Sequence, residues 1–216
     1  MAEFAVIGLG RFGRAVVHNL ALEGQDVLAI DRDAARLKLV EREAESTLCL
    51  DTTDEAALSS LPLSRMATVV VTIGSRAPEA SLLTVAVLQE IGVPRIVARA
   101  FDPRHARLLR ELGAHEVLNP EDEMAQRLAL RLANPGVSDQ IRLGDARVAE
   151  VELPEAFVGS TLEELALPAN YEVAVLALRR RSETILDPDP TERIESGDRG
   201  ILVGPAVSLE RIAALA

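Results

Sequence analysis

A glycine-rich turn near the amino terminus is the feature that most restricts how this chain can fold. Residues 8–13 read Gly-Leu-Gly-Arg-Phe-Gly, and they lie between a short apolar stretch, Phe4–Gly8, and a stretch with helical periodicity, Arg11–Leu22. In that context a G-x-G-x-x-G pattern is typical of the first strand, turn and helix of a dinucleotide-binding sheet. Its glycines allow a tight turn, a close approach of the backbone to a pyrophosphate, and close packing of the helix on the strand. The sequence therefore predicts a phosphate-binding turn built on Gly8, Gly10 and Gly13.

Residues 4–133 alternate short apolar runs with amphipathic stretches. This βαβα pattern predicts an α/β fold, a Rossmann-like doubly wound parallel sheet with helices on both faces. The expected strands are Phe4–Gly8, Val27–Asp31, Thr47–Leu50, Thr68–Ile73, Arg95–Ala100 and Glu116–Leu118. The expected helices are Arg11–Leu22, Ala34–Glu43, one through Leu58, Pro78–Ile91, one from Pro103 to Gly113, and Glu121–Ala133.

A strong breaker, Asn134-Pro135-Gly136, ends this alternation. We therefore predict two domains, a nucleotide-binding domain over 1–134 and a smaller α+β domain over 135–216. A unit of the second size is near the limit at which a domain is stable alone, which favours packing against a partner subunit. Its expected elements are the strands Val148–Leu153, Glu172–Leu178 and Arg199–Val203, a short helix opened by a capping box at Thr161, and a last helix at Val207–Ala216.

The charge and composition exclude several classes of protein. A net charge of −11 lacks the clustered cations that bind a nucleic-acid backbone, so we expect no nucleic-acid partner. No apolar run approaches the ~20 residues of a membrane-spanning helix, and the amino terminus lacks the basic segment of a signal peptide. We therefore expect a soluble, cytoplasmic protein. The single cysteine, Cys49, excludes a disulfide within the chain, and its apolar neighbours indicate a small strand residue rather than a nucleophile.

An acid ends the second expected strand, at the position where this fold meets the ribose of a nucleotide. Asp31 occupies it, and a carboxylate there repels a 2′-phosphate, so a free 2′-hydroxyl is favoured. Arg32 and Arg36 follow, and they either soften that preference or are solvated surface residues.

Other residues at strand ends have two interpretations each. Asp51 and Thr52 either contact the adenine or ribose of a ligand or provide helix-capping groups. Gly74, followed by Ser75, forms either a wall of the ligand site or a plain turn.

The sequence offers no set of residues suited to acid–base or metal chemistry beside a nicotinamide. The three histidines, His18, His105 and His115, are scattered, and Lys38 is the sole lysine. We therefore expect that the protein is not an enzyme and that the nucleotide acts as a signal rather than a reagent. A small NAD-dependent oxidoreductase, with its substrate in the second domain, is the alternative, and a nucleotide-binding module with another partner is a third possibility.

Several sequence motifs resemble those of a known family, and the resemblance extends over essentially the whole chain. The strand and turn of residues 4–13, with Val27–Asp31 and Thr72–Gly74, resemble the RCK-domain regulatory subunits of Trk/Ktr-type potassium uptake systems. Looser matches follow at Val97–Ala100, Leu112–Ala114, Asn119–Glu121, Asp187-Pro188 and Gly197-Asp198.

The resemblance implies a homo-oligomeric ring, typically an octamer assembled from dimers, beneath a membrane-embedded potassium transporter. It implies ATP or ADP, and in some members NAD or NADH, in the Rossmann crevice, where exchange of ligands opens or closes the pore. It places the protein in the cytoplasm, peripherally associated with the inner membrane through the transporter. In some members a cyclic dinucleotide binds the C-terminal domain, and nothing in this sequence decides that point.

The resemblance also suggests roles for individual residues. Arg11, beside Phe12 in the turn, is placed to sense a γ-phosphate, and by resemblance it reaches the nucleotide of the neighbouring subunit; a solvated arginine there would oppose the helix dipole. Arg99 resembles a basic position that faces the phosphates, with a surface salt bridge as the other interpretation. Glu121 resembles an acid that holds a divalent or sodium ion between paired γ-phosphates, although an acid also suits a first helical turn.

Overall fold

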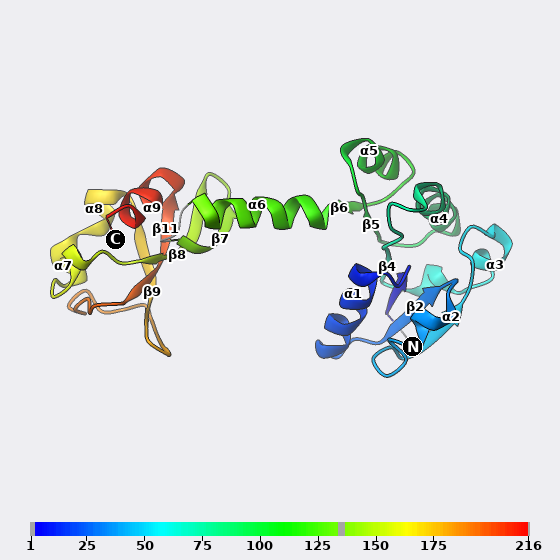
Figure 1. The fold of residues 1–216 in the computed structure, drawn as a ribbon, viewed down its shortest axis with the longest axis horizontal. Helices are drawn as coiled ribbons and strands as arrows, with labels where there is room; N and C mark the ends of the chain where they lie inside the picture. Colours follow the sequence, from blue (N-terminus) through cyan, green and yellow to red (C-terminus); the bar gives the residue numbers. More distant parts are fainter. Residues whose placement is uncertain (1–2, 134–136, 216) are drawn as a thin grey trace. The chain divides into compact units, whose positions relative to one another are not determined.

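The chain forms two compact units, Met1–Asp122 and Glu123–Ala216, in a computed structural model that describes residues 3–133 and 137–215 (Figure 1). Each unit has a hydrophobic core of its own. The boundary expected after residue 134 lies outside the described residues and stays a prediction. Among the described residues, no helix combines the length and the apolar character needed to cross a lipid bilayer.

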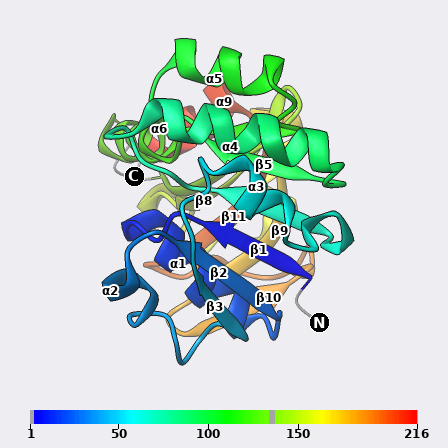
Figure 2. The same ribbon diagram turned by 90° about the vertical axis from the view of Figure 1, so that its right-hand side faces the viewer.

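The first unit contains a six-stranded parallel sheet with the strand order β3-β2-β1-β4-β5-β6. The order runs outward from β1 in both directions, which is the doubly wound topology expected from the sequence. Figure 2 shows β1, β2 and β3 side by side. The strands are β1 (Phe4–Ile7), β2 (Val27–Asp31), β3 (Ser46–Cys49), β4 (Thr68–Val71), β5 (Ile96–Arg99) and β6 (Glu116–Leu118).

Both faces of the central strands β1, β2, β4 and β5 are largely buried, as their β-branched and apolar residues require. Ala5 and Ile7 of β1 belong to one core cluster, whereas Val6 between them belongs to another. The register pairs Ile7 with Ile30 of β2 and with Val71 of β4, so these strands end at the same level. The turns after β1, β2 and β4 therefore meet at one edge of the sheet.

Aspartates begin three helices of this unit. Asp33, Asp54 and Asp102 each accept a hydrogen bond from a backbone N–H in the first turn of α2, α3 and α5. The segment after Leu37 is made of turns, so the helix expected over Ala34–Glu43 is shorter than the sequence suggested. The helices are α1 (Arg11–Leu22), α2 (Ala34–Leu37), α3 (Glu55–Ser59), α4 (Pro78–Ile91) and α5 (Pro103–Glu111), and α6 (Pro120–Ala133) begins in this unit and continues into the second.

The second unit is an antiparallel sheet with the strand order β10-β9-β11-β8-β7, and α9 (Ala206–Ala213) packs on β8 and β11. This is the smaller α+β domain expected from the sequence, and Thr161 forms the predicted capping box at the start of α7 (Leu162–Leu165). The remaining elements are α8 (Leu167–Tyr171), β7 (Val137–Leu143), β8 (Ala146–Glu152), β9 (Ala174–Arg180), β10 (Glu183–Leu186) and β11 (Arg199–Pro205).

Sequence reasoning missed β7 and β10, and both are edge strands of this sheet. An edge strand exposes one row of backbone groups and much of its side-chain surface, so charged and polar residues are tolerated in it. The alternation of apolar and polar residues that reveals a half-buried strand is disturbed in both segments, by Asp139, Gln140 and Arg142 in β7 and by Glu183 in β10.

A buried ion pair fastens β9 to the segment before β11. The Asp198 carboxylate, 1% exposed, accepts two hydrogen bonds from the Arg180 guanidinium at 3.0 and 2.8 Å and one from the Glu195 backbone N–H. Burial alone would raise the pKa of Asp198, but the hydrogen bonds from Arg180 and Glu195 hold it below the usual 3.8. The stability that this pair contributes is therefore present above pH 3.8 and is lost as the pH falls below it.

We expect Asp198→Asn to lower the free energy of unfolding of the second unit by about 3 kcal/mol, because it removes the buried charge from the pair and leaves the partly buried Arg180 guanidinium with only its more exposed partners, Glu192 and Glu195. Urea denaturation at pH 7 measures this loss. Glu195→Gln is the matched control: its carboxylate also contacts Arg180, at 3.1 Å, but is 58% exposed, so we expect a loss below ~1 kcal/mol. Equal losses for the two variants would contradict the assignment.

Candidate functional site

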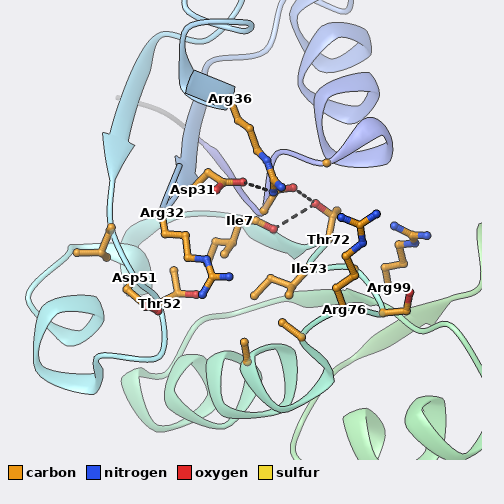
Figure 3. A pocket seen from close by; sticks show the side chains of 17 residues that line it. Ile7, Asp31, Arg32, Arg36, Asp51, Thr52, Thr72, Ile73, Arg76 and Arg99 are labelled. Atoms are coloured by element: carbon orange, nitrogen blue, oxygen red, sulfur yellow. Dashed lines mark hydrogen bonds and ion pairs between the residues drawn. The ribbon is translucent and has the colours of Figure 1, made fainter. Parts of the chain in front are cut away.

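A cavity of about 440 Å³ opens where the turns after β1, β2, β3 and β4 meet (Figure 3). It lies at the carboxyl ends of the strands, at the point where the strand order reverses, which is where ligands bind in doubly wound sheets. Eight residues predicted from the sequence to bind a nucleotide line it: Gly8, Gly10, Asp31, Arg32, Asp51, Thr52, Gly74 and Arg99.

Four other predicted residues do not line this cavity. Arg11 is exposed on the first turn of α1, and Gly13 is buried between α1 and the sheet. Phe12 lies beneath Arg99, whose guanidinium carbon is 5.7 Å from the ring centroid. Glu121, in the first turn of α6, meets the cavity only through its ion pair with Arg99.

Two of the glycines in the turn after β1 are needed by the fold itself. Gly8 has a φ of +92°, and an added Cβ would lie 3.0 Å from the Ile73 backbone nitrogen. A Cβ on Gly13 would overlap the Gly8 carbonyl oxygen and the Thr72 hydroxyl. The same hydroxyl donates to the carbonyls of Gly8 and Ile7, so the crossing of α1 over β1 leaves no room for a side chain.

Gly10 has no such role in the protein. Its φ of −65° suits any residue, and an added Cβ would meet nothing within 4 Å. It lines the cavity and precedes α1, which has no side-chain cap from the described residues and no acid in its first turn. The backbone N–H groups at this helix start are therefore directed to an anion from outside, since the first bond within the helix is made by Arg14.

Asp31 holds the glycine-rich turn in place. Its carboxylate is buried and accepts hydrogen bonds from the Leu9 backbone N–H at 2.6 Å and the Asp33 N–H at 2.9 Å. The Arg36 guanidinium is 3.5 Å from the same carboxylate. The acid predicted to meet a ribose thus also ties the end of β2 to the turn after β1.

Arginines dominate the charged lining of the cavity, although the chain as a whole has a net charge of −11. Arg76 and Arg99 lie on one side and Arg32 on the other (Figure 3). Arg76 was missed by sequence reasoning; its signal was a cation two residues after Gly74 in a loop predicted to border the ligand. Within the described part of the chain, no hydrogen bond or ion pair occupies its guanidinium. Such a cavity suits a ligand with two or more negative charges.

Arg99 makes two kinds of contact. It lines the cavity, and one of its terminal nitrogens pairs with the Glu121 carboxylate. Its buried Nε has no hydrogen-bond partner in the described structure. A buried donor without a partner costs free energy in the folded chain.

Asp51 and Thr52 do not cap the helix that follows them, because Asp54 does so. The Thr53 hydroxyl and backbone N–H donate to the Asp51 carboxylate and lower its pKa below 3.8, so it is ionised at neutral pH. The Thr52 hydroxyl is buried against the Thr84 hydroxyl of α4 at 2.8 Å.

The cavity contains no histidine or cysteine among its described lining residues. His18 contacts Glu43 on the surface, and His115 accepts a hydrogen bond from the Ile96 N–H. Cys49 lies in β3, as expected, and its thiol is exposed. No group of three or more histidine, cysteine, aspartate or glutamate side chains in the described chain has the geometry of a metal centre.

The fold and this geometry define a Rossmann-like domain with an anion-binding turn. The family model of the TrkA-N domain matches residues 4–120, and that of the TrkA-C domain matches residues 148–216.

Similar proteins of known name cover nearly the whole chain. The Ktr system potassium uptake protein C of Bacillus subtilis (strain 168) is 34% identical over 97% of this chain and 95% of its own length. The Ktr system potassium uptake protein A of Vibrio alginolyticus is 34% identical over 94% of this chain and 92% of its own. The chain therefore belongs to the Ktr and Trk family of potassium uptake proteins, and the resemblance drawn from its sequence is confirmed.

Solved structures share the fold. The GsuK channel bound to NAD superposes with a TM-score of 0.64 at 16% identity, over 98% of this chain and 39% of that one. The same channel bound to ADP gives a TM-score of 0.53 at 18% identity, over 62% of this chain and 35% of that one. At these identities the likeness is one of architecture.

Substitutions at Gly10 and Gly13 should affect different properties of the protein, ligand binding at Gly10 and folding at Gly13. We expect Gly13→Ala to cost about 2 kcal/mol or more of unfolding free energy, because its methyl group overlaps backbone and hydroxyl oxygens. Gly10→Ala, at an open and unstrained position, should stay within ~0.5 kcal/mol of the parent. Chemical denaturation of both variants measures this, and a larger loss for Gly10→Ala would show that its role is structural.

Proposed function

We propose that this chain is a nucleotide-sensing regulatory subunit that gates a membrane-embedded potassium transporter from the cytoplasmic side. The single observation that carries the proposal is Gly10: it has no structural need for glycine, yet it opens an uncapped helix onto an arginine-lined cavity. Family membership supplies the transport system to which the sensor belongs.

The cavity fits an adenosine diphosphate or triphosphate, or a dinucleotide such as NAD. The turn at Gly10 and the α1 amino terminus suit the first phosphates, and the guanidinium groups of Arg76 and Arg99 suit further phosphate oxygens. Asp31 and Asp51 suit ribose hydroxyls on the other side. The GsuK structures with NAD and ADP support the same class of ligand.

The nucleotide acts as a signal in this proposal, and the oxidoreductase alternative is less well supported. The described lining residues provide arginines and carboxylates but no histidine, lysine or cysteine to exchange a proton with a substrate. The similar proteins are potassium uptake proteins, which favours regulation over catalysis.

Sensing of the γ-phosphate requires a second subunit in this proposal. Arg11 is exposed and lies outside the cavity of its own chain, so it would read the nucleotide of a neighbour in a dimer, and dimers would assemble into a ring. Glu121, 62% exposed beside Arg99, would hold a divalent or sodium ion between paired γ-phosphates. A ligand shifts the ring between states only through contacts that differ between them, and for ATP against ADP these contacts lie at the γ-phosphate.

Isothermal titration calorimetry with ADP, ATP and NAD tests the proposal directly. We expect the parent chain to bind at least one of them, and Gly10→Ala to weaken that binding at least tenfold, about 1.4 kcal/mol, with unchanged stability. No binding of adenosine phosphates or dinucleotides at millimolar concentration would refute the proposal. Turnover of a nicotinamide cofactor with a small substrate would favour the oxidoreductase.

A second test concerns the γ-phosphate. Arg11→Ala should reduce the ratio of ATP to ADP affinity while ADP affinity stays within about threefold, because only the ATP complex loses a charge-assisted contact. Arg107→Ala, an exposed arginine on α5, is the control and should leave the ratio unchanged. Equal losses of both nucleotides in Arg11→Ala would defeat the assignment.

A further inference from the structure

His105 is a buried titratable residue beside the cavity that the proposed function leaves unused. It lies in the first turn of α5 and is 4% exposed. Its ring stacks on Phe101, with the centroids 4.2 Å apart, and its Nε2 is 2.8 Å from the Ser81 hydroxyl of α4. Its buried Nδ1 has no hydrogen-bond partner among the described residues.

The hydrogen bonds at Ser81 indicate which tautomer the neutral His105 ring adopts. The Ser81 hydroxyl donates its one proton to the Pro78 carbonyl, 2.9 Å away. It therefore accepts from His105, which must carry its proton on Nε2 and leave Nδ1 bare. A second proton on Nδ1 would create a buried N–H donor without a partner, which costs free energy.

The contact between His105 and Ser81 joins two segments that form the arginine-bearing side of the cavity. Residues 72–80, the first wall segment, carry Arg76 and lead into α4. Residues 99–105, the second wall segment, line the cavity through Arg99 alone and lead into α5. One turn further along α4, Thr84 bonds to Thr52 on the opposite wall, so α4 is tied to both sides of the cavity.

The charged surroundings of the ring are limited. Asp102, which caps α5 through the His105 backbone N–H, is the charged group whose field reaches the ring, and the Pro78 carbonyl is near it on the α4 side. Burial lowers the pKa of His105 below 6.5, and this effect exceeds the opposing effects of Asp102 and Pro78. The neutral form of the ring therefore predominates at pH 7.

We propose that neutral His105 is a positioning residue that latches the two wall segments together, and that its protonation releases them and weakens phosphate binding. The inference rests on the proposed function, because it takes the cavity to be the nucleotide site. Loss of the latch moves Arg76 and Arg99 relative to each other, and a phosphate that contacts both arginines senses that displacement.

Calorimetry with ADP on the full chain at pH 7.5 and 5.5 tests this, in the parent and in His105→Gln. The glutamine amide places a donor near the position of Nε2 but does not titrate, so we expect affinity within about threefold of the parent at pH 7.5. Between the two pH values the parent should lose about three- to tenfold more affinity than the variant, as expected for one hydrogen bond. The titration of ADP itself is common to both and cancels.

His18→Asn and His115→Asn are matched controls that remove the other histidines and should keep the pH profile of the parent. If His105→Gln does not fold, Ser81→Ala removes the acceptor instead, and we expect weaker ADP binding at pH 7.5 with a flattened profile. A parent-like profile in His105→Gln, or parent-like affinity and profile in Ser81→Ala, would overturn the latch alone. Absence of ADP binding by the parent at both pH values would overturn the proposed function and, with it, this inference.

Discussion

The close crossing of α1 over β1 is the constraint on which the rest of the first unit depends. Gly13 lets the helix lie against the Gly8 carbonyl and the Thr72 hydroxyl, and this contact fixes where the α1 amino terminus points. The Asp31 carboxylate then fastens the turn to β2 through the Leu9 N–H. Three strands are thereby bound to one turn, and the backbone N–H groups at Gly10 are held toward the cavity before any ligand arrives. Preorganised donors of this kind bind anions without the cost of ordering a loop.

The helices of this unit differ in how they begin. Aspartates within the chain cap α2, α3 and α5, so N–H groups in their first turns have partners in the fold, whereas α4 has no side-chain cap from the described residues. The helix that starts at Gly10 has none from the described residues, and a chain rich in acids places arginines rather than carboxylates on the facing wall. Electrostatic complementarity to an anion is therefore local, and the net charge of the chain conceals it.

The connections between the wall segments suit the regulation that we propose. Arg76 and Arg99 are borne on separate crossovers of the sheet, and buried side-chain hydrogen bonds from α4 join them to each other and to the opposite wall. Buried polar contacts of this kind have a small number of discrete arrangements, which suits an element that must change state when its ligand changes. A ligand that contacts both arginines favours one arrangement by its differential affinity, and assembly with other subunits would transmit that choice.

The sequence by itself determined the doubly wound sheet, the glycine-rich turn after the first strand and the family, because these depend on local periodicity, on glycine and on residues close in the chain. It did not reveal β7 and β10, whose edge positions tolerate polar residues, nor the early end of α2. Only the tertiary structure separated Gly10 from Gly8 and Gly13, placed Arg76 in the cavity and Arg11 outside it, and buried His105 against Ser81. Those properties depend on which atoms of segments far apart in the sequence come into contact, and the spacing of residues along the chain does not specify such contacts.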